Sequence, residues 1–328
     1  MDALLHKRKY MRCLLVGAGY MAKEYLKVLK NFNIELEVVG MGRSNVDLIK
    51  SEFNIEGHSG GIETYFRNTK TRVPDYVIIA VPVAELFSAT ISSINFGIKN
   101  ILVEKPLSLS YDELLTLEKL AIKNEAKISI AYNRRFYGSV SRLKKLVEED
   151  GGVSSVNFEF TEWINVINDI GFPNIVLDKF FLANSSHVVD TVFNIIGAPQ
   201  KIVSYVSGSS VKWHKSGSIF MGFGESIKGI PFSYSSNWGA PGRWAIEVLT
   251  NSRRFYLKPM EKLFIQLHGS VEVNEDQFEN EIDFQFKAGI YKMVSAFLYN
   301  KDQKDLCTLS ELKLYLPFYE KIAGYKTK

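Results

Sequence analysis

The sequence contains little cysteine, and its two cysteines, Cys13 and Cys307, stand far apart in the chain. Two distant cysteines form neither a disulfide framework nor a zinc site, and the five histidines show no metal-ligand spacing to a cysteine. We therefore expect no metal site, and we expect a reducing compartment, the cytoplasm. Cys13 lies inside an apolar run, so its side chain is expected to be buried.

The sequence also lacks a long apolar run and an excess of charge of either sign. No run approaches membrane-spanning length, and the basic segment His6–Lys9 before the short apolar run Met11–Val16 only imitates a signal peptide, because Gly17 ends the run. The net charge is +4, from 40 basic and 36 acidic residues, and the basic clusters Lys7–Lys9 and Lys144–Lys145 have no interleaved aromatic residues. The sequence therefore predicts neither a membrane nor a nucleic acid as a partner.

A chain of 328 residues is comfortable for two domains, and two different hydrophobic patterns divide it. Up to residue 132, continuous apolar strands alternate with helical patterns, which is typical of a doubly wound parallel sheet. After residue 150, short strands with alternating apolar and polar residues predominate, and helices are predicted at 181–196, 281–299 and 310–321. The predicted fold class is α/β: an N-terminal Rossmann domain over 1–132, and a C-terminal α+β domain over 133–328 built on an open, mostly antiparallel sheet. The predicted strands are 11–16, 34–39, 75–81, 100–103 and 127–132 in the first domain, and 156–160, 201–207, 218–223, 230–235, 244–249 and 255–257 in the second.

A glycine-rich turn follows the first predicted strand. Gly17, Gly19 and Ala22 have the spacing Gly-x-Gly-x-x-Ala of the dinucleotide-binding fingerprint. Gly17 permits a tight turn, Gly19 lets a pyrophosphate approach the backbone, and Ala22 lets the following helix pack closely on the strand. Free N–H groups at the start of that helix would then meet the phosphates. The pattern favours a nucleotide site over a purely structural turn.

The end of the second strand bears on the choice between NAD and NADP. NAD enzymes place Asp or Glu there to bind the ribose hydroxyls, whereas here the chain runs through Val39–Ser44 without a carboxylate. Arg43 and Ser44 suit a 2′-phosphate, the first as a charged donor and the second as a hydroxyl. We predict NADP as the cofactor, with NAD as the alternative if Arg43 is only a surface arginine.

Five short motifs occur in order along the chain: the fingerprint, Glu104–Pro106, Tyr132–Phe136, Ser186–Asp190 and Lys287–Tyr291. With them the chain resembles, over nearly its whole length, the glucose-fructose oxidoreductase and inositol dehydrogenase family (Gfo/Idh/MocA). The resemblance implies a Rossmann domain followed by an open sheet, and hydride transfer between nicotinamide and a hydroxyl or keto carbon of a sugar, polyol or sugar nucleotide. It also implies a set of cofactor-binding residues: Gly17, Gly19, Tyr20, Met21, Arg43, Ser44, Val81, Pro82, Glu104 and Lys105.

The same resemblance implies that Lys105 and His187 are catalytic. Lys105 would lie beside the nicotinamide, where a cation stabilises the alkoxide that develops as an alcohol is oxidised; without the motif it would be taken for a solvated lysine. His187 matches the family's acid/base histidine, although a histidine among valines is more often part of a core. Many members carry Asp four residues before this histidine, and this chain has Ala183 there. The departure weakens the expected proton relay. Asp190, one turn beyond His187, could orient it, although the Asp of the resembled family at that place is often structural.

Weaker candidates for substrate contact are Arg134, Trp163, Asn184 and Asp190. Arg134 resembles a family position that reaches substrate, and the alternative is a structural salt bridge. Trp163 and Asn184 offer an aromatic face and an amide of the kind that bind sugars, although a tryptophan is more often core or interface. Other arginines of the second domain, Arg243 and Arg253–Arg254, are expected to be exposed strand residues rather than ligands of a phosphorylated substrate.

The sequence thus predicts an NADP-preferring oxidoreductase with a small sugar or polyol substrate. The alternative comes from a different class: a ligand sensor or regulator of the same fold that binds the dinucleotide without turnover. Ala183 favours that alternative, and the retention of Lys105 and His187 argues against it. Apolar residues on both faces of the second-domain sheet, as in Ile230–Phe232 and Trp244–Ile246, predict a homodimer or homotetramer packed through it.

Overall fold

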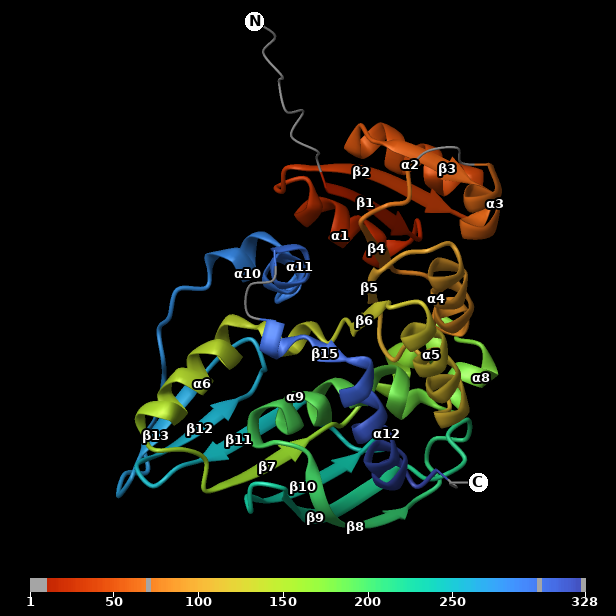
Figure 1. Cartoon of the computed structure of the whole chain (residues 1–328). Helices are drawn as coiled ribbons and strands as arrows, with labels where there is room; N and C mark the ends of the chain where they lie inside the picture. The colour runs from red at the N-terminus through yellow and green to blue at the C-terminus, as the bar shows by residue number, and fades with distance from the viewer. Residues whose placement is uncertain (1–10, 69–71, 300–302, 326–328) are drawn as a thin grey trace, which may run out of the picture. The chain divides into compact units, whose positions relative to one another are not determined.

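The computed structural model describes residues 11–68, 72–299 and 303–325, so the basic segment His6–Lys9, with its cluster Lys7–Lys9, falls outside the described residues. The chain divides into two compact units (Figure 1). The first unit comprises Met1–Glu104 and Leu117–Ser129, and the second comprises Lys105–Thr116 and Ile130–Lys328. The division therefore falls between Glu104 and Lys105, inside one of the predicted motifs.

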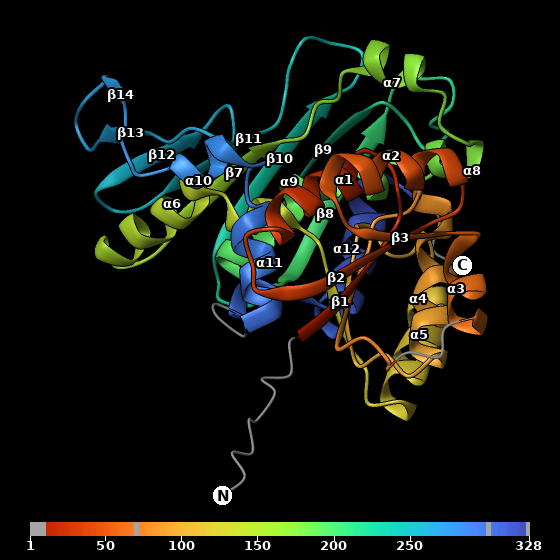
Figure 2. The same ribbon diagram turned by 90° about the horizontal axis from the view of Figure 1, so that it is seen from above.

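The first unit is built on a parallel sheet whose strands follow the order β6-β5-β4-β1-β2-β3. Helices α1 and α2 lie on one face of this sheet, and α3 and α4 lie on the other (Figures 1 and 2). The predicted doubly wound arrangement is thus confirmed. The strands are β1 (Met11–Val16), β2 (Ile34–Gly40), β3 (Glu56–Ser59), β4 (Tyr76–Ile79), β5 (Asn100–Val103) and β6 (Lys127–Ile130), and the helices of this half of the chain are α1 (Tyr20–Leu29), α2 (Arg43–Phe53), α3 (Gly61–Asn68), α4 (Leu86–Asn95) and α5 (Tyr111–Lys123).

Both faces of the central strands are covered, which explains their continuous apolar sequences. Cys13, Leu14 and Leu15 in β1 are each at most 2% exposed, as expected for Cys13. Two predicted strands end earlier than expected, because β4 ends at Ile79 and β6 at Ile130.

The buried face of α4 combines apolar and polar residues. Leu86, Ala89 and Ile94 are buried there together with two polar residues, Thr90 and Ser93. Their hydroxyls donate to helix carbonyls four residues earlier, at 2.7 and 2.8 Å, so these polar side chains are buried without an unpaired group.

Helix α5 begins with half of a capping box. The Ser110 Oγ accepts from the Glu113 N–H at 3.3 Å. The Glu113 carboxylate does not return the bond to Ser110; its Oε2 accepts instead from the Leu109 N–H at 3.1 Å and from the Ser108 hydroxyl at 2.7 Å. The turn after the Glu104–Pro106 motif is therefore tied to the start of the helix.

The second unit is built on an eight-stranded sheet with the order β14-β13-β12-β11-β7-β10-β9-β8. Neighbouring strands of this sheet are antiparallel except β7 and β10, so the predicted open, mostly antiparallel sheet is confirmed. Helices α6, α9 and α12 lie on one face of it (Figure 1). The strands are β7 (Ser155–Glu159), β8 (Pro199–Ser207), β9 (Ile219–Ser226), β10 (Pro231–Asn237), β11 (Ala245–Leu249), β12 (Arg253–Leu257), β13 (Phe264–Leu267) and β14 (Val273–Glu275). The two-residue strand β15 (Cys307–Thr308) is not part of this sheet. The helices are α6 (Gly138–Glu149), α7 (Ile164–Ile170), α8 (Asn174–Leu177), α9 (Ser186–Ile196), α10 (Glu281–Gln285), α11 (Ile290–Tyr299) and α12 (Leu309–Ala323).

A buried ion pair joins the motif around residue 135 to α9. The Arg135 guanidinium donates to both carboxylate oxygens of Asp190, at 2.6 and 2.7 Å, and neither side chain is exposed. Glu311 and Tyr319 of α12 complete the cluster, by contacting Arg135 and Asp190 respectively. A fully hydrogen-bonded pair of this kind is retained because loss of one partner leaves an uncompensated buried charge.

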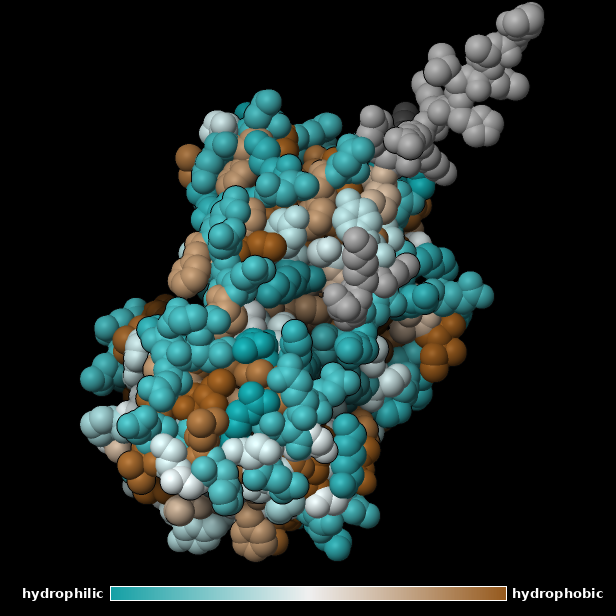
Figure 3. Space-filling view, turned by 90° about the vertical axis from the view of Figure 1, so that its left-hand side faces the viewer, coloured by the Kyte–Doolittle hydropathy of each residue, from teal (hydrophilic) through white to brown (hydrophobic). Residues whose placement is uncertain are grey.

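The opposite face of the second sheet carries exposed apolar side chains. Val203 and Tyr205 of β8 are cross-strand partners of Phe223 and Met221 of β9, and each of the four is more than half exposed. On the face of the molecule in Figure 3, hydrophobic side chains are interspersed with hydrophilic ones. Within the described residues, no helix has both the length and the apolar character to cross a membrane.

Candidate functional site

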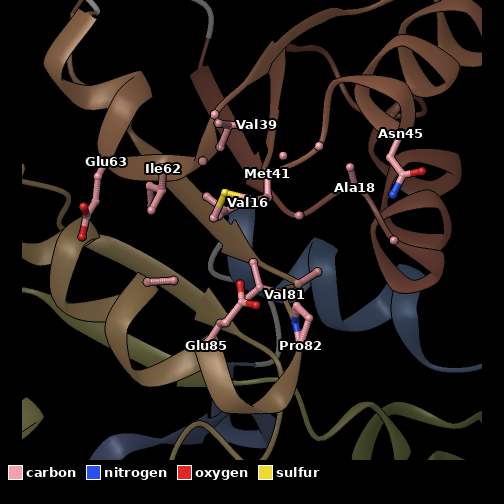
Figure 4. Close-up of a pocket in the computed structure, with 18 of the residues that line it drawn as sticks. Val16, Ala18, Val39, Met41, Asn45, Ile62, Glu63, Val81, Pro82 and Glu85 are labelled. Atoms are coloured by element: carbon pink, nitrogen blue, oxygen red, sulfur yellow. The ribbon is translucent and has the colours of Figure 1, made fainter. Parts of the chain in front are cut away.

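A cavity of about 730 Å³ opens at the carboxyl ends of β1, β2 and β4 in the first unit (Figure 4). This is the point at which the strand order reverses, between β1 and β4, and it is where ligands bind in open α/β sheets. Asn45 projects from α2 at one end of the cavity, and Glu63 lies toward the other end. The predicted cofactor residues that line the cavity are Gly17, Gly19, Tyr20, Met21, Val81 and Pro82.

The two fingerprint glycines meet different structural requirements. Gly17 has a φ of +124°, and a Cβ on it would lie 2.2 Å from the carbonyl oxygen of Ala80. Only glycine is accommodated there, so the close approach of the turn to β4 depends on it. Gly19 has an ordinary φ of −94° and open space around the position of a Cβ. A side chain at Gly19 would therefore project toward the cavity, at the start of α1, where a phosphate meets free N–H groups.

The turn at this cavity shows the packing that a dinucleotide-binding fingerprint requires. Ala22 is fully buried in the first turn of α1, as the fingerprint requires for close packing of helix and strand. Tyr20 and Met41, which are 68% and 72% exposed, form part of the cavity wall as apolar surfaces open to a ligand. Sequence reasoning did not single out Asn45, Glu63 or Glu85 as lining residues, because nothing in their local pattern marks them.

Arg43 and Ser44 do not line the cavity, although their neighbours Gly42 and Asn45 do. Both residues are exposed in the first turn of α2, which contains no acidic residue. The Arg43 side chain is 87% exposed, and its Nε lies 3.5 Å from the Asp47 carboxylate. Glu104 also stands apart from the lining, because its Oε1 accepts a 2.7 Å hydrogen bond from the buried hydroxyl of Tyr25.

Lys105 lies in the second unit, close to the start of α9. Its Nζ donates to the backbone carbonyl of Ala183. Ala183 stands in a π-helical turn (Phe181–Ser185) that leads directly into α9, and such turns often accompany functional sites. A backbone oxygen therefore holds the lysine at the position where the resembled family often has a carboxylate.

His187, in the first turn of α9, is 4% exposed and its Nδ1 has no hydrogen-bond partner among the described residues. Its ring packs against the rings of Tyr132 and Trp244, at centroid distances of 5.6 and 5.9 Å. Burial lowers the pKa of His187 well below its ordinary value, and the positive charges of Arg134, Lys105 and Lys287 lower the pKa further. The imidazole is therefore neutral at neutral pH.

Of the two alternatives for Asp190, its contacts support the structural role and not the orientation of His187. Both oxygens of Asp190 accept hydrogen bonds from Arg135 or Tyr319, and the carboxylate is fully buried. The same ion pair gives Asp190 a packing role and leaves its predicted contact with substrate without geometric support.

Glu162 is the buried carboxylate of this region, and sequence reasoning missed it. It accepts hydrogen bonds from the Ser185 hydroxyl at 2.6 Å, the Asn184 amide at 2.9 Å and the Arg243 guanidinium at 3.2 Å. Burial raises its pKa, an effect that these three donors oppose. Glu162 thus holds the turn that carries Ala183, and the predicted ligand Asn184 is engaged in that contact.

The aromatic and cationic candidates lie together around Trp244. The Arg134 Cζ is 4.4 Å from the Trp244 ring, and the Arg243 Cζ is 4.4 Å from the rings of both Trp244 and Trp163. Trp163 is 55% exposed, so it is not a core residue. Arg253 and Arg254 of β12 pair with Asp150 and Glu247 respectively, which accounts for them as structural residues.

Comparison with known proteins adds a family for the first part of the chain. Residues 11–132 match the oxidoreductase family with an NAD-binding Rossmann fold (Gfo/Idh/MocA). Curated protein sequences contain no match to the chain.

Solved structures share the fold over nearly the whole chain. An oxidoreductase from Agrobacterium radiobacter in complex with NAD+, L-tartaric acid and magnesium has 11% identity and a TM-score of 0.76, with 97% of this chain and 95% of that chain covered. UDP-N-acetylglucosamine 3-dehydrogenase GnnA from Acidithiobacillus ferrooxidans has 14% identity and a TM-score of 0.73, with 97% and 98% covered. A super-repressor mutant of Gal80p from Saccharomyces cerevisiae has 15% identity and a TM-score of 0.76, with 96% of each chain covered. At such identities the similarity shows a common fold and no common activity.

Proposed function

Through residues 11–132 the chain belongs to the oxidoreductase family with an NAD-binding Rossmann fold, and from that premise we propose that it is an NADP-preferring oxidoreductase acting on a sugar, polyol or sugar nucleotide. The observation that carries the proposal is the arrangement of Lys105, the Ala183 carbonyl and the unpartnered Nδ1 of His187 at the start of α9. A lysine held by a neutral acceptor beside a neutral histidine is suited to proton transfer at a hydroxyl group.

The first unit holds the dinucleotide. Gly17 and Gly19 leave room for a pyrophosphate at the start of α1. The residues Tyr20, Met21, Val81 and Pro82 line the same cavity and would contact the bound dinucleotide. The preference for NADP rests on the acid-free first turn of α2, with Arg43 and Ser44 exposed beside the lining residue Asn45. NAD remains the alternative cofactor, because the matched family has an NAD-binding Rossmann fold.

The second unit supplies the groups that handle the proton. The nicotinamide, when bound, provides the acceptor or donor of hydride. Lys105, as an ammonium group, stabilises negative charge on the substrate oxygen, because a fixed cation favours the alkoxide over the alcohol. His187 is neutral and accepts the proton, since burial and the neighbouring cations keep its pKa low. Aromatic packing against Tyr132 and Trp244 orients the imidazole in place of a carboxylate.

The functional division of the chain is 1–132 for nucleotide binding and 133–328 for substrate binding and assembly. Trp163 and Arg134 are the substrate contacts that retain support, since one is exposed and the other partly exposed. The apolar face formed by Val203, Tyr205, Met221 and Phe223 is the surface for a homodimer or homotetramer. Two fully buried free cysteines suit a reducing cytoplasm.

A regulator without turnover is the second function, and Ala183 is the observation that favours it. Without a carboxylate at that position, Lys105 donates to a backbone oxygen, which cannot pass a proton on to His187. The similarity to the super-repressor mutant of Gal80p shows that repressors also have this fold.

Hydride exchange separates the two functions. The full chain is incubated with deuterium-labelled NADPH or NADH and a panel of keto-sugars, inosose and keto-sugar nucleotides, and deuterium in the products is measured by mass spectrometry. Transfer from either cofactor supports the oxidoreductase. Tight cofactor binding without transfer to any member of the panel supports the regulator.

A further inference from the structure

Arg134 is a cation for which the described residues provide no ion-pair partner. It lies in the 3-10 turn Asn133–Phe136, where its Nη1 donates to the Asn133 side-chain oxygen at 3.3 Å. Glu162 and Glu261 act on it only at longer range, and burial is the main cause that lowers its pKa. The other two arginines near it differ, because Arg135 pairs with Asp190 and Arg243 pairs with Glu162. The charge of a guanidinium that is largely removed from water is normally compensated by an anion. Arg134 has no such anion among the described residues, so we expect a ligand to supply it.

The surroundings of Arg134 hold it ready for a ligand. Its Cζ lies 4.4 Å from the Trp244 ring and 5.8 Å from the Tyr137 ring. A guanidinium stacked on an aromatic ring keeps its N–H groups in its own plane, which suits the two oxygens of a carboxylate or phosphate. The residue is partly exposed, so these N–H groups can be reached.

A second observation places a ligand at the same cluster. The His187 ring also packs on Trp244, and its buried Nδ1 has no partner among the described residues. A buried polar atom of this kind is normally satisfied by protein, water or ligand. Among the described residues, Lys105, Lys287 and Arg134 are the charged groups that act on His187. The carboxylate near Trp244, that of Glu162, pairs with Arg243, so the cluster around His187 and Trp244 carries an excess of positive charge.

We propose that the substrate of this chain carries an oxyanion, a carboxylate or a phosphate, which binds the guanidinium of Arg134 while a substrate hydroxyl meets His187. The proposal rests on the oxidoreductase function above and narrows its substrate to sugar acids and sugar phosphates. Arg134 and His187 both pack on the Trp244 ring, so one small ligand could contact both of them. The oxyanion would also supply the counter-ion that Arg134 lacks among the described residues.

Matched ligand pairs test the charge requirement. Binding of D-glucose, D-glucuronate and D-glucose 6-phosphate, and of the corresponding galactose series, is measured by calorimetry on the full chain saturated with NADP. The acidic members are expected to bind roughly tenfold to a hundredfold more tightly than the neutral sugar, as for a hydrogen bond to a charged group. Their affinity is also expected to fall with added sodium chloride, whereas that of the neutral sugar is not. The carboxylate and phosphate arms show which oxyanion is preferred.

Substitutions test the residue. Arg134→Gln is expected to abolish the preference for acidic ligands, and Arg134→Lys is expected to keep part of it. The control is Arg67→Gln. The exposed Arg67 donates to the carbonyl of Glu63 in its own helix, so its substitution should leave the preference unchanged. If Arg134→Gln unfolds, the pairwise preference and its salt dependence in the unmodified chain decide the matter.

The outcomes separate this proposal from the function on which it rests. Equal binding of acidic and neutral sugars, or an acid preference that survives Arg134→Gln, overturns the proposal even if neutral sugars are turned over. An acid preference that depends on Arg134, without hydride exchange between the cofactor and any acidic ligand or any member of the exchange panel, supports the binding site and overturns the enzymatic function.

Discussion

Adding one methyl group at each fingerprint glycine should affect different properties of the protein. In Gly17→Ala the new Cβ meets the Ala80 carbonyl oxygen at 2.2 Å and its carbon at 2.7 Å, and the residue keeps a φ of +124°. The left-handed backbone costs about 1–2 kcal/mol for a non-glycine residue. Relief of the overlap adds about 1–3 kcal/mol, since backbone atoms rather than a flexible side chain must move. We therefore expect the free energy of unfolding of the first unit to fall by about 2–5 kcal/mol.

Gly19→Ala should spare stability and weaken cofactor binding. Its Cβ has no neighbour within 4 Å, so the free energy of unfolding should change by less than about 0.5 kcal/mol. The methyl group enters the space where the pyrophosphate meets the N–H groups of α1, and a lost charged hydrogen bond weakens binding roughly tenfold to a hundredfold. Urea unfolding and fluorescence titration with NADPH measure the two quantities. A stable Gly17→Ala protein, or full NADPH affinity in Gly19→Ala, would refute the assignment of these roles.

Three further predictions concern the cofactor, the pH dependence and the assembly. Arg43→Ala should weaken NADPH roughly tenfold to a hundredfold in fluorescence titration and leave NADH unchanged, and equal or tighter NADH binding in the unmodified chain would contradict the NADP preference. Because the pKa of His187 is lowered below its ordinary value of 6.5, the basic form persists in the folded state, and kcat/KM should hold to a pH below 6.5. Stability should then decline as pH falls below 6.5, since the unfolded chain gains a proton there, and Lys287→Gln should move the acid limb of kcat/KM upward by removing a nearby cation. Sedimentation at micromolar concentration should show a homo-oligomer that Phe223→Glu dissociates, and a monomeric unmodified chain would exclude the role of this 60%-exposed side chain.

The parts of the fold that could be predicted are those whose burial is visible in local sequence. The continuous apolar strands β1, β4 and β5 are buried on both faces, and the fingerprint after β1 lies at the cavity as expected. The family resemblance is confirmed over residues 11–132. Strand β3, with the sequence Glu-Gly-His-Ser, has no apolar pattern and was not predicted, because an edge strand needs little burial.

The candidate site was harder to predict because its contacts join distant segments. Glu162 meets Asn184, Ser185 and Arg243 at separations of 22, 23 and 81 residues, and no local pattern marks a carboxylate after a strand as buried. The π-helical turn before α9 and the contact of Lys105 with a backbone oxygen likewise have no sequence signal. The sequence left open whether Asp190 orients His187 or has a structural role, because the Arg135 ion pair to both carboxylate oxygens joins residues that are 55 positions apart.

The central claim, that Lys105 takes part in hydride transfer, is tested most directly by the rate of that transfer in Lys105→Met. The matched control is Lys99→Met, because the exposed Lys99 also donates from its Nζ to a backbone carbonyl, that of Asn124. With the substrate found in the exchange panel, we predict that Lys105→Met transfers deuterium about 10²–10⁴ times more slowly than the unmodified chain, while NADPH affinity stays within a few-fold and Lys99→Met is unaffected. Transfer by Lys105→Met at the rate of the unmodified chain would contradict the account.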